Sequence, residues 1–317
     1  MTTKFWMGVL LGILTFAGLL LTTTVMFAVV KLGVFKRSSP IYLISTANLL
    51  CDCIQLILAI TYLVPSIISD SWLFEGDRHN KFLQFLGAVF LFCWYYGSVA
   101  QILMAVNRVC VICIHSNRFF SYRNVLIIVI ILFPIAGIVA WISQYVSPCC
   151  KISFDHKYLS YSYTAKDDVP NYSNMYIDLP LNSSSSAICA ACYVYIILYV
   201  RKMRHSYTVD AAENGKRIKE YRYALQFCVI SVFYLCGWIS FRVFPVLIGV
   251  RGLEYFIVVS ACVTLNSAAN AIVYITSNLE VQHILYNSKV STPVYANSSP
   301  RIVGVKSIPS HHYKSSR

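Results

Sequence analysis

The chain has 317 residues, of which 57% are hydrophobic and only 12% are charged. Soluble domains carry about 25% charged residues, so the composition argues against a soluble globular protein. The formal net charge is +13, but binding to nucleic acid needs a basic face on a soluble domain, and no nucleic-acid partner is predicted. These numbers favour a protein embedded in a lipid bilayer.

Seven charge-poor runs follow one another along the chain, at residues 5–30, 38–69, 82–107, 124–150, 179–200, 223–250 and 255–279. Each is long enough for a membrane-spanning helix, which needs about 20 residues. Only Asp52 and Arg242 interrupt them with a charge. Lipid admits only helices and closed barrels, and the runs lack the alternation of barrel strands. The chain is therefore predicted to be an all-α bundle of seven transmembrane helices.

The orientation of the bundle follows from the Lys and Arg residues between the runs. The first, third and fifth connections and the C-terminal segment hold 18 of them, and the second, fourth and sixth connections hold six. Because basic residues accumulate on the cytoplasmic side, the N-terminus is predicted to lie outside and the C-terminus in the cytoplasm.

Outside the spans, two segments are distinctive. Residues 1–286 are interpreted as one membrane-embedded domain, and residues 287–317 as a disordered cytoplasmic tail, since they contain Ser, Pro and Lys with little apolar periodicity. The fourth connection, residues 147–184, is the one sizeable segment predicted to lie outside. It carries two glycosylation sequons, at Asn171 and Asn182. Asn171 is the predicted glycan site, because Asn182 lies close to the predicted membrane boundary.

Polar residues inside the spans are few, and lipid makes each of them costly unless it faces the bundle interior. Asn48 and Asp52 lie four residues apart on one face of the second predicted helix, and Asn266 and Asn270 repeat this spacing in the seventh, where Ser267 adjoins Asn266. We expect these five residues to form one buried polar cluster. Its role stays open between helix–helix contact and a conformational switch. The Asp52 carboxylate is also a candidate sodium site, because oxygen ligands lie nearby, although water alone could solvate it; no other cofactor is predicted.

Two arginines accompany the spans. Arg108 ends the third, and Arg242 lies eight residues before the end of the sixth. Either can be a boundary residue that extends its charged group into water. Arg242 also lies four residues after Trp238 on one helical face, so an inward-facing pair in a ligand cavity is the rival interpretation.

Four short motifs occur in order on the predicted helices: "NLLCD" in the second, "AVNRVCVI" in the third, "FYLCGW" in the sixth and "NAIVY" in the seventh. In this order the chain resembles the rhodopsin-type G-protein-coupled receptors and, among them, the nematode serpentine chemoreceptors of class x, over residues 8–286. The resemblance implies a receptor that binds an extracellular small molecule and activates a heterotrimeric G protein. It also implies the plasma membrane, in a sensory-neuron cilium.

The resemblance assigns roles to individual residues. Asn107 and Arg108 occupy the position of the acidic-Arg-Tyr motif, and Asn270 to Tyr274 that of the Asn-Pro-x-x-Tyr element. Glu220 lies five turns before Trp238, where the family often places an acid that pairs with the arginine in the closed state. The implied coupling switch comprises Asn107, Arg108, Glu220, Asn270 and Tyr274.

A ligand cavity is predicted from helix depth. Its walls would be Trp94, Tyr95, Tyr96, Trp238 and Arg242, although aromatic residues in such places also serve as plain core packing. If Arg242 faces inward, an acidic ligand is favoured.

The chain departs from the family pattern at two informative places. Asn107 stands where the family has an acid, which implies a weaker restraint on Arg108. Residues 69–92 contain no Cys, so the usual disulfide between the third helix and the outer loop has no partner there. Cys149 and Cys150 of that loop have three open alternatives: a bond to each other, a bond to Cys189, or two free thiols.

Other functions fit less well. A retinal-binding opsin needs a lysine in the seventh helix for its Schiff base, and residues 255–279 have none. An ion-coupled transporter or a seven-span ligand-gated channel is the alternative function, although the transporter would show repeats and the channel type would place its N-terminus inside. The sequence has no H-E-x-x-H motif and no metal-ligand spacing of Cys and His. The chain is therefore predicted not to be an enzyme, with no certain metal site.

Overall fold

The computed structural model describes residues 3–115, 118–163, 169–206, 211–248 and 252–286. Most of them form long helices, whose bounds are α1 Thr3–Val30, α2 Ile41–Leu58, α3 Val64–Ser69, α4 Lys81–Val109, α5 Tyr122–Trp141, α6 Leu179–Ser206, α7 Ala211–Ile248, α8 Ile257–Ser277 and α9 Leu279–Tyr286. Two short strands, β1 Ile152–Asp155 and β2 Ser160–Tyr163, pair antiparallel.

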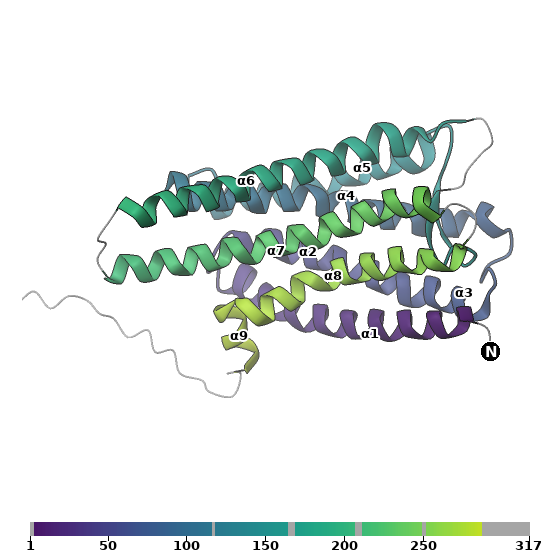
Figure 1. Cartoon of the computed structure of the whole chain (residues 1–317), viewed down its shortest axis with the longest axis horizontal. Helices are drawn as coiled ribbons and strands as arrows, with labels where there is room; N and C mark the ends of the chain where they lie inside the picture. Colours follow the sequence, from purple (N-terminus) through teal and green to yellow (C-terminus); the bar gives the residue numbers. More distant parts are fainter. Residues whose placement is uncertain (1–2, 116–117, 164–168, 207–210, 249–251, 287–317) are drawn as a thin grey trace, which may run out of the picture.

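The long helices lie side by side in one bundle (Figure 1). α1 packs on α2 and α8, α4 packs on α2, α5 and α6, and α7 packs on α8. The N-terminus and the β1–β2 hairpin lie at one end of the bundle, called here the hairpin end, and α9 lies at the other, called the α9 end (Figure 1). The predicted helical bundle is confirmed, whereas its orientation in a membrane stays a prediction.

Six helical segments of the described chain are long and apolar enough to cross a bilayer: Thr3–Phe35, Ile41–Ser69, Lys81–Ile114, Tyr122–Val146, Asn174–Lys202 and Glu254–Ser277. The segment Ile41–Ser69 joins α2 and α3 through the helical turn Ala59–Leu63. α7 adds a shorter apolar stretch, Cys228–Val243, within a helix of 38 residues. These helices correspond to the seven predicted runs.

The boundaries differ from the prediction where local chemistry intervenes. The fourth span ends at Val146 and not at Cys150, because Pro148 disfavours helical geometry in the residue before it. Ser147 accordingly has the extended angles φ −57° and ψ 130°. The β hairpin that follows was not predicted. Its strands are only four residues long, which is too short for a clear alternating pattern.

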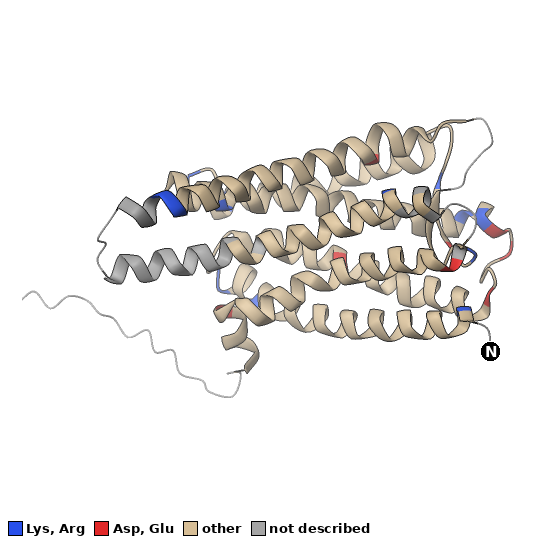
Figure 2. Cartoon of the chain, in the orientation of Figure 1, with Lys and Arg blue, Asp and Glu red and all other residues tan. Residues whose placement is uncertain are grey.

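The charged residues gather at the two ends of the bundle, and few lie along its middle section (Figure 2). The surface of the middle section is apolar too. In α5, Ile127, Ile131, Ile135 and Ile138 are exposed, and their spacing places them on one side of the helix. Because these apolar side chains form no hydrogen bonds with water, this side of α5 is suited to contact with lipid.

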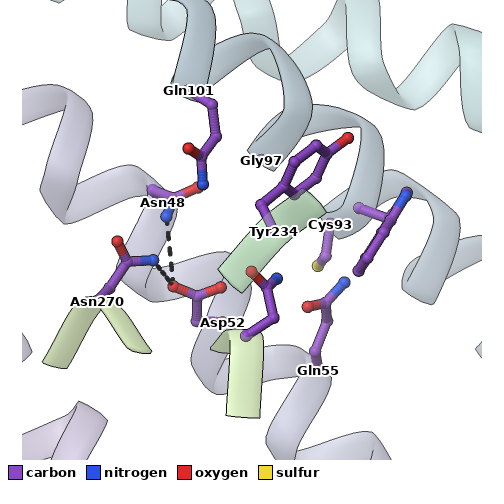
Figure 3. Close-up of a pocket in the computed structure, with 10 residues that line it drawn as sticks. Asn48, Asp52, Gln55, Cys93, Gly97, Gln101, Tyr234 and Asn270 are labelled. Carbon is purple, nitrogen blue, oxygen red and sulfur yellow. Dashed lines mark hydrogen bonds between the residues drawn. The ribbon is translucent and has the colours of Figure 1, made fainter. Parts of the chain in front are cut away.

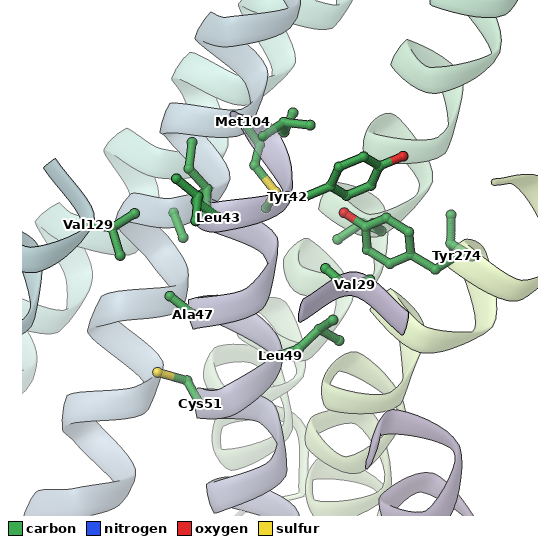
Figure 4. Close-up of a cluster of buried hydrophobic side chains, with 14 of the residues drawn as sticks. Val29, Tyr42, Leu43, Ala47, Leu49, Cys51, Met104, Val129 and Tyr274 are labelled. Carbon is green, nitrogen blue, oxygen red and sulfur yellow. The ribbon is translucent and has the colours of Figure 1, made fainter. Parts of the chain in front are cut away.

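The core of the bundle is built around α2 and α4. Figure 4 shows the part around α2, where Leu43, Ala47 and Cys51 face one way and Val29 and Tyr274 lie on the other side of the helix. All five are buried. This packing fixes α2 between α4 and α8, the helices that supply most of the polar groups described next.

Candidate functional site

A buried carboxylate lies at the centre of the bundle. Asp52 of α2 is only 6% exposed, and it accepts hydrogen bonds from Asn48 Nδ2 (3.3 Å) and from Asn270 Nδ2 of α8 (2.7 Å). Both bonds reach the same oxygen, Oδ2 (Figure 3). The structure thus brings together three of the five residues of the predicted polar cluster, and they connect α2 to α8.

A small cavity adjoins this carboxylate (Figure 3). Its volume of about 10 Å³ is on the order of one water molecule. The lining residues come from α2, α4, α7 and α8, and they are Asn48, Asp52, Gln55, Cys93, Trp94, Gly97, Gln101, Tyr234, Asn266 and Asn270. Asn266 therefore joins the cluster as a wall of the cavity.

Ser267 has a different partner from the one expected. Its hydroxyl donates a hydrogen bond to Gln55 Oε1 (3.0 Å), so Ser267 forms a second contact between α2 and α8, one turn from Asp52. Gln55 is 4% exposed, but its amide has no charge, so it stands out less in an apolar run than an ionisable residue does. The signal that could have identified Gln55 is a neutral glutamine within an apolar run.

Toward the α9 end, the polar contacts continue. The Tyr274 hydroxyl of α8 forms a hydrogen bond with the Ser45 hydroxyl of α2, and Ser45 donates to Met104 Sδ of α4 (3.8 Å). Beyond them, the Asn278 side chain caps the start of α9 by accepting from the backbone N–H groups of Glu280 and Val281. Polar contacts between α2 and α8 therefore extend from the centre of the bundle toward its α9 end.

Arg108 and Asn107 lie near the α9 end of α4, and each is 5% exposed. Arg108 is thus buried within the bundle, whereas a residue that extends its charge into water would be exposed. The side chain of Glu220, its predicted partner, lies outside the described residues.

The structure does not arrange the predicted cavity residues around one space. Trp94 lines the small cavity and stacks on Tyr234, with ring centroids 5.4 Å apart. The Tyr95 hydroxyl instead lies 3.1 Å from Ser143 Oγ, beyond α5, and Tyr96 packs against Phe133 of α5. Three consecutive helical residues point in different directions, so only one of them can line the cavity.

Arg242 has an internal partner that the sequence analysis missed. Its Nη2 donates to Asp178 Oδ2 at 2.9 Å. Asp178 immediately precedes α6, and its other oxygen, Oδ1, accepts from Asn182 Nδ2 (2.8 Å). Asn182 Oδ1 in turn accepts from Ser98 (2.9 Å) and from Tyr234. A chain of hydrogen bonds therefore connects the ion pair to Tyr234 at the wall of the small cavity.

The sequon at Asn182 is unsuitable for a glycan, because this side chain is fully buried and both ends of its amide are hydrogen-bonded. Asn171 is partly exposed, and its Oδ1 accepts from the backbone of Asn174 (2.9 Å).

The β1–β2 hairpin is held in the bundle by polar side chains. Gln144 Oε1 accepts from Ile152 N (3.0 Å), and Gln144 Nε2 donates to Ile152 O (2.9 Å) and to Gln84 O (2.9 Å). Arg78 forms an ion pair with the fully buried Asp155. These contacts anchor the hairpin to the segment after α5 and to the start of α4.

The two loop cysteines follow the first of their three alternatives, since Cys149 and Cys150 are bonded to each other. Their disulfide therefore does not connect the hairpin to any helix. In the same region, burial lowers the pKa of His156 below its usual 6.5, while its ring packs edge-on against Trp72 at 4.8 Å. The nearby charges Asp155 and Asp70 act in the opposite direction.

In this bundle a buried aspartate of α2 joins α8, and the architecture is that of the seven-helix rhodopsin fold. Its fold is similar to that of squid rhodopsin, with a TM-score of 0.73 and 14% identity over 90% of this chain and 85% of that chain. The chain belongs to the serpentine type seven-transmembrane G-protein-coupled chemoreceptors, Srx, whose family model matches residues 13–278. No curated protein matches it in sequence. It is therefore a multi-pass membrane protein of the receptor class.

Proposed function

We propose that this receptor binds an extracellular small molecule near the hairpin end of the bundle and activates a heterotrimeric G protein at the α9 end. The observation that carries the proposal is the series of buried polar contacts between α2 and α8. It runs from Asp52 and Asn270 to Ser45 and Tyr274. In a chemoreceptor family member, such a series can transmit a movement of the helices from one end to the other.

The mechanism follows from which helices meet at the small cavity. Tyr234 of α7 stacks on Trp94 and also bonds to Asn182, so a ligand that shifts α7 changes both contacts. Asn270 lies on α8, which packs on α7, and its bond to Asp52 then readjusts. The loss of the Tyr274–Ser45 contact would free the α9 end of α8 from α2. Ser45 also contacts Met104 of α4, one turn before Arg108.

The proposed orientation follows the Lys and Arg distribution. The N-terminus and hairpin would lie outside and α9 in the cytoplasm, in the plasma membrane of a sensory-neuron cilium. An epitope tag at the C-terminus should therefore be inaccessible to antibody on intact cells and accessible after permeabilisation. Staining of intact cells would contradict the orientation.

The proposal is tested by nucleotide exchange on a heterotrimeric G protein, measured with the full chain in membranes. Small-molecule pools should raise the exchange rate, and Arg108→Ala should abolish the increase at unchanged surface expression. Arg118→Ala is the matched control, because Arg118 is exposed near the same end of α4. Glu220→Gln should raise basal exchange by releasing Arg108.

A ligand-evoked ion current in the absence of G protein, with no nucleotide exchange, would contradict the proposal and favour the channel alternative. Neutral, acidic and basic pools should each be used, because the sequence does not specify the ligand class.

A further inference from the structure

The Arg242–Asp178 pair changes the ligand chemistry expected from a lone arginine. A lone inward-facing Arg242 would favour an acidic ligand. In the structure its charge already has a counter-ion 2.9 Å away, and the two side chains are only 24% and 14% exposed. The pair is neutral as a whole, so an added ionic ligand brings an uncompensated charge into a poorly solvated region.

The guanidinium of the pair keeps several donors that no described residue uses. Both oxygens of Asp178 are occupied, one by Asn182 and one by Arg242. A guanidinium has five N–H donors, and among the described residues Arg242 uses only Nη2, for Asp178. The site thus has unused donors on Arg242, while each Asp178 oxygen already accepts one hydrogen bond.

A second unused donor lies one helical turn away. Trp238 precedes Arg242 by four residues, on the same face of α7, and its buried Nε1 has no hydrogen-bond partner among the described residues. A buried donor without an acceptor is unfavourable, so an acceptor from outside the chain would relieve it.

We infer that the receptor, if it functions as proposed above, selects neutral ligands that carry a hydrogen-bond acceptor, such as ketones, over carboxylates and amines. The acceptor bonds to Trp238 Nε1 and to the free N–H groups of Arg242. An amine brings a positive charge that Arg242 repels, and each oxygen of Asp178 already accepts one hydrogen bond.

A carboxylate ligand supplies acceptors, but the negative charge of Asp178 repels it. For two unit charges about 6 Å apart at an effective dielectric constant of about 20, the repulsion corresponds to a factor on the order of 100 in the dissociation constant. This repulsion offsets much of the attraction by Arg242, so the cost of dehydrating the carboxylate is not recovered.

The test uses pools of straight-chain methyl ketones, carboxylates and primary amines matched in chain length. Binding is measured as the rise in unfolding temperature of the purified full-length receptor, without G protein. For the wild type, the ketone pool should act at the lowest concentration. A wild type that is stabilised by no pool, or first by carboxylates or amines, overturns the inference.

Two variants sharpen the test. Asp178→Asn removes the opposing charge and keeps a similar shape, so carboxylate affinity should rise on the order of 100-fold. The double variant Asp178→Asn with Arg242→Gln should lose this gain. Asp70→Asn is the matched control, because Asp70 pairs with Lys4 at the surface of the same end. An unchanged carboxylate affinity in a folded Asp178→Asn receptor also overturns the inference.

Trp238→Phe keeps an aromatic ring and removes the N–H, so ketone affinity should fall about five- to tenfold, while affinity for the matched alkane stays constant. Ketone binding without nucleotide exchange would contradict the receptor function and leave the ligand class standing. Nucleotide exchange driven equally by carboxylates and ketones in the wild type would support the receptor function and contradict the inferred ligand class.

Discussion

The anchoring of the hairpin can be tested at one glycine. Gly87 of α4 faces β1 so closely that a Cβ atom built on it would lie 2.3 Å from Ile152 O and 2.9 Å from Gln144 Nε2. An ordinary contact needs about 3.4 Å, so Gly87→Ala must displace the hairpin backbone by about 1 Å. The displaced Ile152 is the residue that Gln144 holds by both its N–H and its C=O.

The magnitude follows from three contributions. Overpacking in a close-packed interior costs about 1–3 kcal/mol, and each weakened hydrogen bond of Gln144 costs about 1 kcal/mol. Alanine is favoured over glycine within a helix by about 1 kcal/mol, which offsets part of the loss. The net destabilisation is about 2–4 kcal/mol, and for a chain of this size it lowers the unfolding temperature by roughly 3–6 °C.

The assay is thermal unfolding of the purified receptor, with Gly137→Ala as the matched control. Gly137 lies within α5, and its Cβ would meet only Phe92 Cδ2, at 4.0 Å. The control should therefore be neutral or slightly stabilising. Equal unfolding temperatures for the two variants would refute the close approach of the hairpin to α4.

Three further predictions concern the same molecule. Reduction of the Cys149–Cys150 disulfide should shift the unfolding temperature less than Gly87→Ala does, because a bond between adjacent residues closes no loop through a helix; a larger shift would contradict the non-covalent anchor. Burial lowers the pKa of His156, so the unfolded chain binds the proton more readily. Stability should fall as the pH drops below about 6.5, and His156→Gln should reduce this fall; a pH profile unchanged by the variant would count against it. If sodium binds beside Asp52, NaCl in place of choline chloride should raise the unfolding temperature of the wild type but not of Asp52→Asn, and an equal response of both would exclude this site.

The sequence predicts the architecture well because lipid imposes a simple rule. A run of about 20 apolar residues has few alternatives to a helix in a membrane, and the seven runs correspond to the helices that the structure shows. The hairpin lacks such a rule. Its place depends on Gln144 and on the absence of a side chain at Gly87, and neither contact follows a periodic pattern.

Within the site, the sequence predicts best the polar residues that lie within an apolar run. Asn48, Asp52 and Asn270 each lie within an apolar run, so a buried position was the economical expectation, and the structure brings them into hydrogen-bonding contact. Tyr95 and Tyr96 lie in a continuous aromatic segment, where the sequence gives the depth along the helix but not the direction of the side chain. Tyr96 packs against α5, and the Tyr95 hydroxyl contacts Ser143 just beyond α5, so neither lines the small cavity.

The partner of Arg242 could not be predicted from its own helix. The sequence supports two interpretations, a residue that reaches for water and a residue that faces a ligand, and both give the arginine a partner from outside the chain. The partner is Asp178, which stands just before the fifth predicted run and looks like an ordinary loop residue. In lipid a lone charge is costly enough that a nearby acid at a helix end competes with water and with ligands for it. An acid in an adjacent loop should therefore be considered as the partner of an intramembrane arginine before the charge of the ligand is predicted. Here that pairing reverses the expected preference from acidic ligands to neutral acceptors.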